Sequence, residues 1–396
     1  MSRLADLIEE LCPDGVEYRA LGDVAELKRG QAVTRKEIME GQVPVIAGGR
    51  EPAYYIDRSN RQGETIVIAG SGAYAGFVSF WNEPIFVSDA FSVVVDSGTL
   101  QPRFVYHWLC GRQEAIHALK SGGGVPHVYP KDVAKLRCPI PPLEVQREIA
   151  RILDQFTTLE AELEAELEAR RAQYEHYRNH LLSYDSLAAR GPVEMVKLGD
   201  VIAISRGASP RPISKFVTQG EGIPWIKIGD VDPRGKFVTS AAERITSAGA
   251  EKSRKVLPGD FILSNSMSFG RPYILQIEGC VHDGWLILSN VADHWIPDFL
   301  YHSLRTDNVQ HQFAQLASGG AVRNLNSRVI ESVELALPQK VVQEEIVSVL
   351  DRFDALVNDI SSGLPAEIAA RRAQYEHYRD RLLSFPEKGV SGSDAS

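Results

Sequence analysis

Cysteine is scarce in this chain of 396 residues, and no two cysteines lie close together in the sequence. The four cysteines lie far apart and no CxxC spacing occurs. Structural zinc sites and disulfide frameworks both require paired or regularly spaced cysteines. We therefore expect a reduced, cytoplasmic protein without a metal site.

Long apolar runs are also missing. The N-terminal sequence MSRLADLIEELCPDG has no apolar core of the signal-peptide type. No run approaches the roughly 18 apolar residues that a membrane-spanning helix needs. The length instead predicts two or three domains, each large enough for its own core, and no membrane association.

The chain lacks an excess of positive charge. Its formal net charge is −9, which argues against a nucleic-acid binder if bulk charge alone is considered. The acidic excess is densest in residues 149–185, whereas residues 186–345 are balanced. The distribution therefore leaves nucleic-acid binding open for parts of the chain.

The common catalytic motifs HExxH, GxSxG and GxGxxG are absent, and the ten histidines form no metal-ligand cluster. Asp89 in VSDAF and Asp283 in VHDGW occupy equivalent positions. No Glu-x-Lys element accompanies either aspartate, so we expect a structural or base-contacting role rather than nuclease chemistry.

What the chain does contain is an internal duplication. The string ARRAQYEHYR occurs at 169–178 and again at 370–379. ILDQF and VLDRF, FVYHWL and FLYHSL, and two copies of LGDV follow in the same order in both halves. The organisation is therefore A-B-A′-B′, with divergent A blocks and similar B segments.

The B segments have the apolar spacing of long helices. Apolar residues recur every three or four positions along 149–185 and 346–385, among strong helix formers. This pattern is typical of a coiled-coil seam, and the alternative is a pair of solvent-covered surface helices. About 36 helical residues would span roughly 54 Å. In the second copy four extra residues around SSGLP (361–365) predict a kink or a restart, because proline disrupts a helix interior.

The A blocks have the pattern of compact α/β domains. Short strand-like runs such as VPVIAGG, ETIVIAGS, IPWIKIGDV and WLILSN alternate with turn residues. Each block then has one expected helix, at 104–119 and 299–316. The sequence thus predicts an α+β chain with domains at 1–148 and 186–345, helices at 149–185 and 346–385, and a disordered tail at 386–396.

A glycine-rich loop follows each of these helices, KSGGGVPHVYPKD and ASGGAVRNLNSRV. The loops lack the GxxxxGK[ST] spacing of a nucleotide P-loop. Two interpretations stay open, a helix cap with a turn and a cradle for a nucleic-acid backbone. The polar groups beside the loops that would serve the second are Lys120, His127, Lys131, Arg323, Asn324 and Arg328.

This order of elements resembles the specificity subunit of Type I restriction-modification systems. The resemblance covers residues 1–385 and is carried by ARRAQYEHYRNHLLSY, by LDRFDALVNDISSGLPAEIAARRAQYEHYRDRLLSF and by IPPLEVQREIARILD. It implies two α/β target-recognition domains joined by two long antiparallel coiled-coil helices with pseudo-two-fold symmetry. Each domain would read one half of a split, asymmetric site in double-stranded DNA, and the helices would set the spacer.

The resemblance also implies partners and cofactors. Two methylation subunits would dock on the helices for adenine methylation, and restriction subunits would complete this phage-defence complex. The chain itself would be non-catalytic and hold no cofactor, while S-adenosylmethionine, ATP and Mg would belong to the partner subunits. The expected partner-helix contacts are Phe156, Leu163, Tyr174, Tyr177, Phe353, Ile360, Tyr375 and Tyr378.

DNA reading would use polar side chains on loops between the strands, with arginine suited to guanine and asparagine to adenine. Besides the glycine-rich loops, the candidates are Arg50, Tyr54, Tyr55, Ser71, Tyr74, Arg206, Arg211, Lys227, Asn265, Ser268 and Arg271. Two other classes of function are weighed against this one. A self-contained methyltransferase or nuclease is disfavoured by the missing motifs, and a coiled-coil scaffold with two protein-binding domains remains a competing hypothesis.

Overall fold

The computed structural model describes residues 2–34, 41–122, 124–233, 235–265, 270–316, 325–359 and 361–389. The chain forms two compact units. Unit 1 consists of Met1–Glu162 and Ala369–Ser396, and unit 2 consists of Leu163–Ile368. Each unit therefore contains one A block, the start of its own long helix, and the string-bearing end of the other copy's helix.

Unit 1 contains three small sheets that share short connections. A four-stranded antiparallel sheet has the order β2-β8-β5-β6, a three-stranded sheet has the order β4-β3-β7, and β1 pairs with β9. The strands are β1 Glu17–Ala20, β2 Ala25–Arg29, β3 Val43–Ile46, β4 Tyr54–Ile56, β5 Thr65–Ala69, β6 Val78–Trp81, β7 Phe86–Val87, β8 Ala90–Val95 and β9 Arg137–Ile140. The shorter helices are α1 Ser2–Leu11, α2 Leu21–Val24, α3 Pro102–Gly111, α4 Gln113–Ala118 and α5 Pro130–Val133.

Unit 2 repeats this plan with additional strands. Its sheets have the orders β11-β20-β17-β18-β14, β12-β15-β13-β19-β16 and β10-β21. The strands are β10 Val193–Lys197, β11 Ala203–Arg206, β12 Val217–Thr218, β13 Ile223–Ile226, β14 Phe237–Val238, β15 Glu243–Ile245, β16 Arg254–Val256, β17 Phe261–Ser264, β18 Pro272–Leu275, β19 Gly279–Val281, β20 Trp285–Ser289 and β21 Glu334–Pro338. The helices are α7 Tyr184–Ala188, α8 Leu198–Val201, α9 Ser247–Ala250, α10 Pro297–Leu304, α11 Asp307–Leu316 and α12 Ser327–Glu331, with the 3-10 turns η2 Ile213–Lys215, η3 Ile228–Asp230 and η4 Val291–Asp293.

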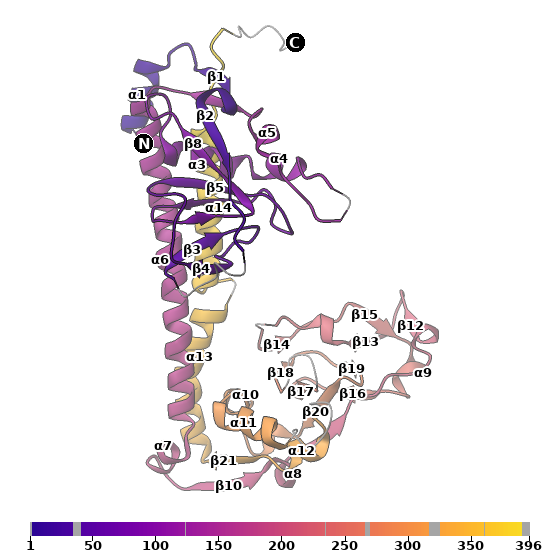
Figure 1. Cartoon of the computed structure of the whole chain (residues 1–396). Coiled ribbons are helices and arrows are strands. Elements are labelled where there is room, and N and C mark those ends of the chain that lie inside the picture. Colours follow the sequence, from indigo (N-terminus) through magenta and orange to yellow (C-terminus); the bar gives the residue numbers. More distant parts are fainter. Residues whose placement is uncertain are drawn as a thin grey trace. The chain divides into compact units, whose positions relative to one another are not determined.

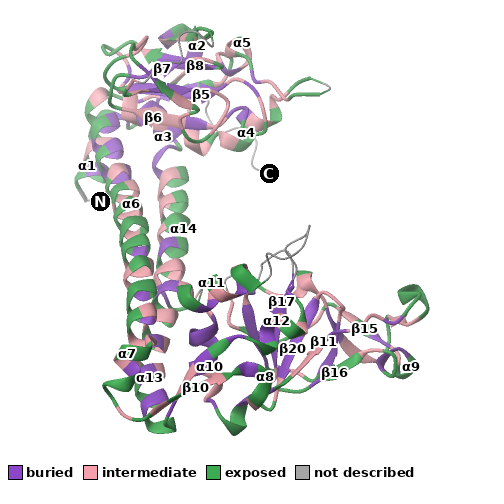
Figure 2. Cartoon of the chain, turned by 60° about the horizontal axis from the view of Figure 1, so that its bottom comes forward, coloured by how far each residue is buried: buried purple, intermediate pink, exposed green. Residues whose placement is uncertain are grey.

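The strands predicted in both A blocks are confirmed, and they form the centre of each unit. The central strands β5 and β17 are buried along their whole length (Figure 2), and apart from Thr65 and Ser264 at their ends they are apolar. Continuous apolar strands are expected where both faces of a sheet are covered.

Three long helices carry the B segments. They are α6 Leu143–Leu181, α13 Lys340–Asn358 and α14 Leu364–Leu382. In unit 1, α6 lies beside α14, and in unit 2 it lies beside α13 (Figure 1). The pairing in unit 1 is antiparallel, because Phe156 stacks on Tyr378 while Glu160, further along α6, pairs with Arg372, earlier on α14.

The predicted interruption at SSGLP is confirmed. α13 ends at Asn358 and α14 begins at Leu364, whereas α6 continues through the corresponding region. A Cβ on Gly363 would lie 2.5 Å from the carbonyl oxygen of Ala355, so only glycine fits this turn. Pro365 occupies the second position of α14, where its missing N–H costs nothing.

Three boundaries differ from the sequence prediction. The long helices begin earlier, at Leu143 and Lys340, because buried glutamines in their first turns, Gln146 and Gln343, hold the preceding corner. The single helices expected at 104–119 and 299–316 are each two helices. Arg112 and Arg305 break them, since both residues have dihedral angles outside the helical region.

The last residues of the chain differ as well. Residues 386–389, assigned above to a disordered tail, contact unit 1. The Val16 amide donates to Pro386, the Lys388 amide donates to Val16, and Glu387 pairs with Arg137 at 2.5 Å. Backbone pairing and an ion pair hold this stretch, a pattern that its polar composition does not reveal.

Candidate nucleic-acid interface and helix contacts

The same arginine–glycine corner occurs in both units. Gly30 follows β2 and its amide donates to Ala90, and Gly207 follows β11 and its amide donates to Trp285. A Cβ would lie 1.9 Å from the Ser88 carbonyl oxygen at Gly30 and 2.1 Å from that of His282 at Gly207. Each close approach requires glycine. The corner brings the preceding arginine, Arg29 or Arg206, next to β8 or β20, just before which Asp89 or Asp283 lies.

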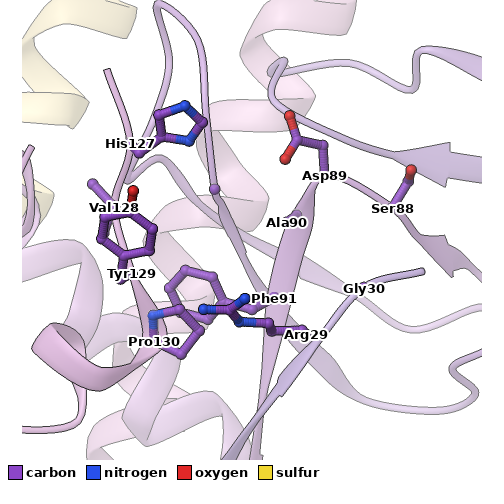
Figure 3. Close-up of a pocket in the computed structure, with 11 residues that line it drawn as sticks. Arg29, Gly30, Ser88, Asp89, Ala90, Phe91, His127, Val128, Tyr129 and Pro130 are labelled. Atoms are coloured by element: carbon purple, nitrogen blue, oxygen red, sulfur yellow. The ribbon is translucent and has the colours of Figure 1, made fainter. Parts of the chain in front are cut away.

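In unit 1 this corner opens into a cavity of about 230 Å³. Arg29 and Asp89 come from the strand side, and His127 and Tyr129 come from the loop after α4 (Figure 3). The His127 and Tyr129 rings stack with centroids 6.0 Å apart. Ser71, on a third loop, donates a hydrogen bond to Asp89. The cavity therefore combines a cation, a carboxylate and two rings.

The neighbouring loops of unit 1 add cations and aromatic rings. The Arg50 guanidinium lies over the rings of Tyr74 (5.0 Å) and Phe77 (5.4 Å). Burial, together with the charges of Lys120 and Arg50, lowers the pKa of His117. Both cations therefore lie close to His117.

The first glycine-rich loop is a hairpin rather than a simple helix cap. Ser121 and His127 exchange both backbone hydrogen bonds, and the Gly72 amide donates to Pro126. Gly122 has a φ of +114°, which favours glycine. The hairpin also pairs with the loop of Ser71, because Ser71 and Ser121 both form bridges with His127. Lys131, just beyond, lies over the Tyr129 ring at 5.7 Å.

Tyr54 and Tyr55 lie on a different sheet, on strand β4. Tyr54 packs against the apolar cluster that includes Val45 and Phe86, so it contributes to the core. Tyr55 faces outward and is 52% exposed. Of the two, only Tyr55 has a surface to offer to a ligand.

In unit 2 three of the candidates converge on Asp283. The Arg206 guanidinium donates to the Asp283 carbonyl oxygen at 2.9 Å, and the Asn265 side chain donates to the same oxygen at 3.5 Å. Arg211 pairs with the carboxylate at 3.2 Å, and Ser209 donates to it at 2.8 Å. Burial opposes ionisation of Asp283, yet Ser209, the charge of His282 and Arg211 hold its pKa below the usual value.

Two candidates of unit 2 lie away from this cluster. Lys227 forms an ion pair with Glu243 at 2.5 Å. Arg271 packs over the Tyr273 ring at 5.6 Å and lines a cavity of about 190 Å³ beside the long helices. Arg271 was predicted from its residue type and loop position. The sequence does not show toward which face its side chain points. Ser268, Arg323 and Asn324 lie outside the described residues.

The tyrosines of the repeated string contact the recognition domains. In unit 1 the Tyr375 hydroxyl lies 2.8 Å from His107 Nδ1, and His107 Nε2 lies 2.8 Å from Asp154. In unit 2 the Tyr174 hydroxyl lies 3.1 Å from His302 Nδ1, and His302 Nε2 lies 2.8 Å from Asp351. We call these the His107 triad and the His302 triad.

Each triad is tied to its domain by a further cation. Arg103 donates to Asp154 at 2.8 Å. In unit 2 Lys236 reaches Asp351 at 2.8 Å and Asp298 at 2.5 Å. Burial alone would lower the pKa of Lys236, but these two carboxylates raise it. The two halves thus share the triad and differ in the cation that supports it.

The other predicted helix contacts lie within the units. Phe156 stacks on Tyr378 with centroids 5.4 Å apart, and Tyr177 stacks on Phe353 at 5.5 Å. Leu163 packs against the core of unit 2. Ile360 lies outside the described residues.

Sequence reasoning did not select the histidines and aspartates of the triads. A signal was available, because FVYHWL and FLYHSL each contain the histidine and ILDQF and VLDRF each contain the aspartate. Each histidine is repeated within the otherwise divergent A blocks, and each aspartate within the similar B segments.

Within the residues that the structure describes, no group of three His, Cys, Asp or Glu side chains could hold a metal ion. The helices of the same described ranges include none that is long and apolar enough to cross a membrane.

Comparison with known proteins agrees with this geometry. The family model of the Type I restriction modification DNA specificity domain matches twice, at residues 13–169 and 191–370. The chain is 31% identical over 299 residues to the EcoR124I/EcoR124II specificity subunit of Escherichia coli, covering 72% of this chain and 71% of that one.

Two solved structures share the fold. One is the Type I restriction-modification S subunit from M. genitalium, with a TM-score of 0.57 at 17% identity, covering 93% of this chain and 96% of that one. The other is a chain from a study of complex assembly in the type I restriction-modification system, with a TM-score of 0.57 at 20% identity, covering 94% and 98%. Two matched domains, two similar units and this degree of identity lead to one conclusion: the chain belongs to the family of Type I restriction-modification DNA specificity subunits, which recognise DNA and are not themselves catalytic.

Proposed function

We propose that this chain reads a bipartite, asymmetric site in double-stranded DNA, one half with each unit. The observation that carries the proposal is the combination of a repeated framework with different surfaces. Both units have the arginine–glycine corner and a His–Asp–Tyr triad. Their loops carry different side chains, so two different half-sites are expected.

The recognition surfaces have suitable chemistry despite the net negative charge. In unit 1 Arg29, at the end of β2, lines the cavity, and Lys131 on α5 lies over the ring of Tyr129, which also lines it. Arg50 and Lys120 lie on loops close to His117. In unit 2 Arg206 and Arg211 adjoin Asp283. Cations of this kind bind phosphates and position the protein, and the polar groups between them specify bases.

The long helices would set the spacing between the half-sites. α6 has 39 residues without interruption, a length of about 58 Å at roughly 1.5 Å per residue. It takes part in the cores of both units, through residues such as Leu153 in unit 1 and Leu167 in unit 2. A continuous helix shared by two binding units is suited to act as a ruler.

The outward face of the repeated string would dock the methylation subunits. Tyr174 is buried and its counterpart Tyr375 is half-buried, whereas Glu175, His176, Glu376 and His377 are exposed. The same exposed pair therefore occurs twice, which suits one type of partner bound twice. In this proposal the methylation subunits carry S-adenosylmethionine, and restriction subunits supply the ATP- and Mg-dependent steps.

Selection from a randomised DNA library tests the proposal. The chain is co-purified with its cognate methylation subunit, and the DNA that the complex retains is sequenced. We expect two short, different sequence blocks at a fixed spacing, and no such enrichment when this chain is omitted. Enrichment of no sequence by a stable complex would contradict DNA recognition and favour the scaffold hypothesis.

The docking face has a separate test. The double variants Glu175→Ala/His176→Ala and Glu376→Ala/His377→Ala should each weaken co-purification of the methylation subunit while the chain stays folded. Glu168→Ala, also exposed and on α6, serves as a control because it lies outside the string. Unchanged co-purification by both double variants would contradict docking on this face.

A further inference from the structure

Asp89 and Asp283 hold equivalent positions but differ in what their carboxylates bind. Asp89 lies just before β8, which pairs with β2, and Asp283 lies just before β20, which pairs with β11. The arginine–glycine corner follows β2 in unit 1 and β11 in unit 2. Equivalent residues in a duplicated domain begin with the same surroundings. Differences in their contacts therefore indicate different roles.

The carboxylate of Asp283 is occupied by its own domain. Ser209 donates to Oδ1 at 2.8 Å, and His282 lies 3.1 Å from the same oxygen. Arg211 pairs with Oδ2 at 3.2 Å. Both carboxylate oxygens of Asp283 are thus occupied, and they bind the segment that contains Ser209 and Arg211.

The carboxylate of Asp89 is largely available. Within the described parts of the chain its one side-chain hydrogen bond comes from the Ser71 hydroxyl, which donates to Oδ2. Asp89 is exposed, whereas Ser71 is buried. Ser71 therefore fixes the position of the Asp89 carboxylate through Oδ2. The other oxygen, Oδ1, is available to a ligand.

The surroundings of Asp89 suit a nucleic acid with one exception, the carboxylate itself. Arg29, His127 and Tyr129 line the same cavity, and the loops beside it carry Arg50 and Lys120. A carboxylate repels phosphates, so in such a surface it has to face groups that donate hydrogen bonds. On DNA those groups are the exocyclic amines, N4 of cytosine and N6 of adenine, in the major groove.

We propose that Asp89 is a specificity-determining residue that accepts a hydrogen bond from an exocyclic base amine, cytosine N4 in the first place, in the half-site read by unit 1. Ser71 holds the carboxylate in position, and the neighbouring cations bind the flanking phosphates. Asp283 has no such role, because its oxygens are already used. This assignment rests on the proposed function. It specifies which chemical group of the base is recognised at one base pair of the first half-site.

The test compares Asp89→Asn with Asp283→Asn in the library selection described above. The wild-type complex should prefer an amine-bearing base at one position of the first block. Asp89→Asn should reduce that preference by roughly tenfold or more, the size expected for one good base contact, and leave the second block unchanged. Asp283→Asn should leave the sequence of both blocks unchanged and lower only the yield of bound DNA.

The outcomes separate this assignment from the proposed function. A wild-type complex that enriches no site overturns both. A wild-type complex that enriches a bipartite site, with Asp89→Asn enriching the identical site with the same preferences, overturns the assignment alone. If Asp89→Asn does not assemble, Ser71→Ala takes its place. It keeps the carboxylate but removes its anchor, and should weaken the preference at the same base pair. An unaltered preference in Ser71→Ala would then overturn the assignment.

Discussion

The Tyr375 hydroxyl lies 2.8 Å from Nδ1 of His107, a residue 268 positions earlier in the chain. The corresponding contact in unit 2 joins Tyr174 to His302. Each copy of the repeated string therefore binds the recognition domain of the other repeat. The two contacts are not identical, because the Tyr174 hydroxyl also donates to Asp354 at 2.9 Å.

Replacing either tyrosine with phenylalanine should destabilise the unit that contains it. Asp154 can only accept, so His107 Nε2 carries the proton and Nδ1 accepts from Tyr375. Burial raises the pKa of Tyr375, which keeps its hydroxyl protonated. Tyr375→Phe leaves a buried acceptor without its donor, at a cost of about 1–3 kcal/mol in the free energy of unfolding.

Amide hydrogen exchange at increasing urea concentrations measures the loss of protection in each unit separately. Tyr375→Phe should reduce protection in unit 1, and Tyr174→Phe should reduce it in unit 2. Tyr378→Phe is the matched control, because its ring stacks on Phe156 and no hydroxyl contact is described for it. Equal effects of Tyr375→Phe and Tyr378→Phe would show that the triad is not the stabilising contact.

Stability should fall as the pH drops below about 6.5, the ordinary pKa of histidine. Burial lowers the pKa of His107 and His302, although Asp154 and Asp351 partly oppose the shift. In this range the unfolded chain takes up protons that the folded chain refuses, so the unfolded state is favoured. Above that pH both states hold neutral imidazoles, and these residues contribute no pH dependence.

The measurement is the free energy of unfolding between pH 5 and 8 for the wild type and for His107→Gln/His302→Gln. The variant should be less stable at pH 8 and show a smaller loss of stability toward pH 5. An equal loss in both proteins would mean that other groups cause the pH dependence.

Much of this fold can be predicted from the sequence, because duplication and periodicity are local signals. The central strands, the long helices and the break at SSGLP are confirmed, since each has its own pattern of apolar residues, glycine or proline. The exchange of string-bearing helix ends between the units follows from the antiparallel pairing that the resemblance implied, but its individual side-chain contacts could not be predicted. A contact such as His107–Tyr375 joins distant residues and leaves no trace in the spacing of either segment.

The candidate site divides in the same way. Arg50, Ser71 and His127 were selected on loops and are gathered near the cavity because glycine turns bring those loops together. Arg271 was selected by the same reasoning, yet its side chain packs on Tyr273. Residue type and loop position do not specify which face a side chain occupies, and that information comes only from the strand register.

The arginine–glycine corners should not tolerate a methyl group. Gly30→Ala would drive Cβ into the carbonyl group of Ser88, and Gly207→Ala into that of His282. Each should lower the free energy of unfolding by about 2 kcal/mol or more. Gly124→Ala is the control, because no atom lies within 4 Å of its Cβ position.

Thermal unfolding of the three glycine variants checks this prediction. Gly124→Ala should stay within about 0.5 kcal/mol of the wild type, as surface changes usually do. A wild-type melting temperature for Gly30→Ala would show that the corner can open without cost.

Lengthening the helices should lengthen the DNA spacer. Four residues inserted into α6 after Glu162, with four more between α13 and α14, keep the apolar stripes on nearly the same face. The helix grows by about 6 Å, close to two base-pair rises of about 3.4 Å. Library selection should return the same two blocks with a longer spacer, and an unchanged spacer would contradict the ruler.

The most direct test of the account is methylome sequencing of cells that express this chain with its cognate methylation subunit. The account predicts N6-methyladenine at one bipartite, asymmetric motif, which disappears when the chain is omitted. Methylation at a single continuous motif, or at the same motif without the chain, would contradict the claim that the two units specify the site.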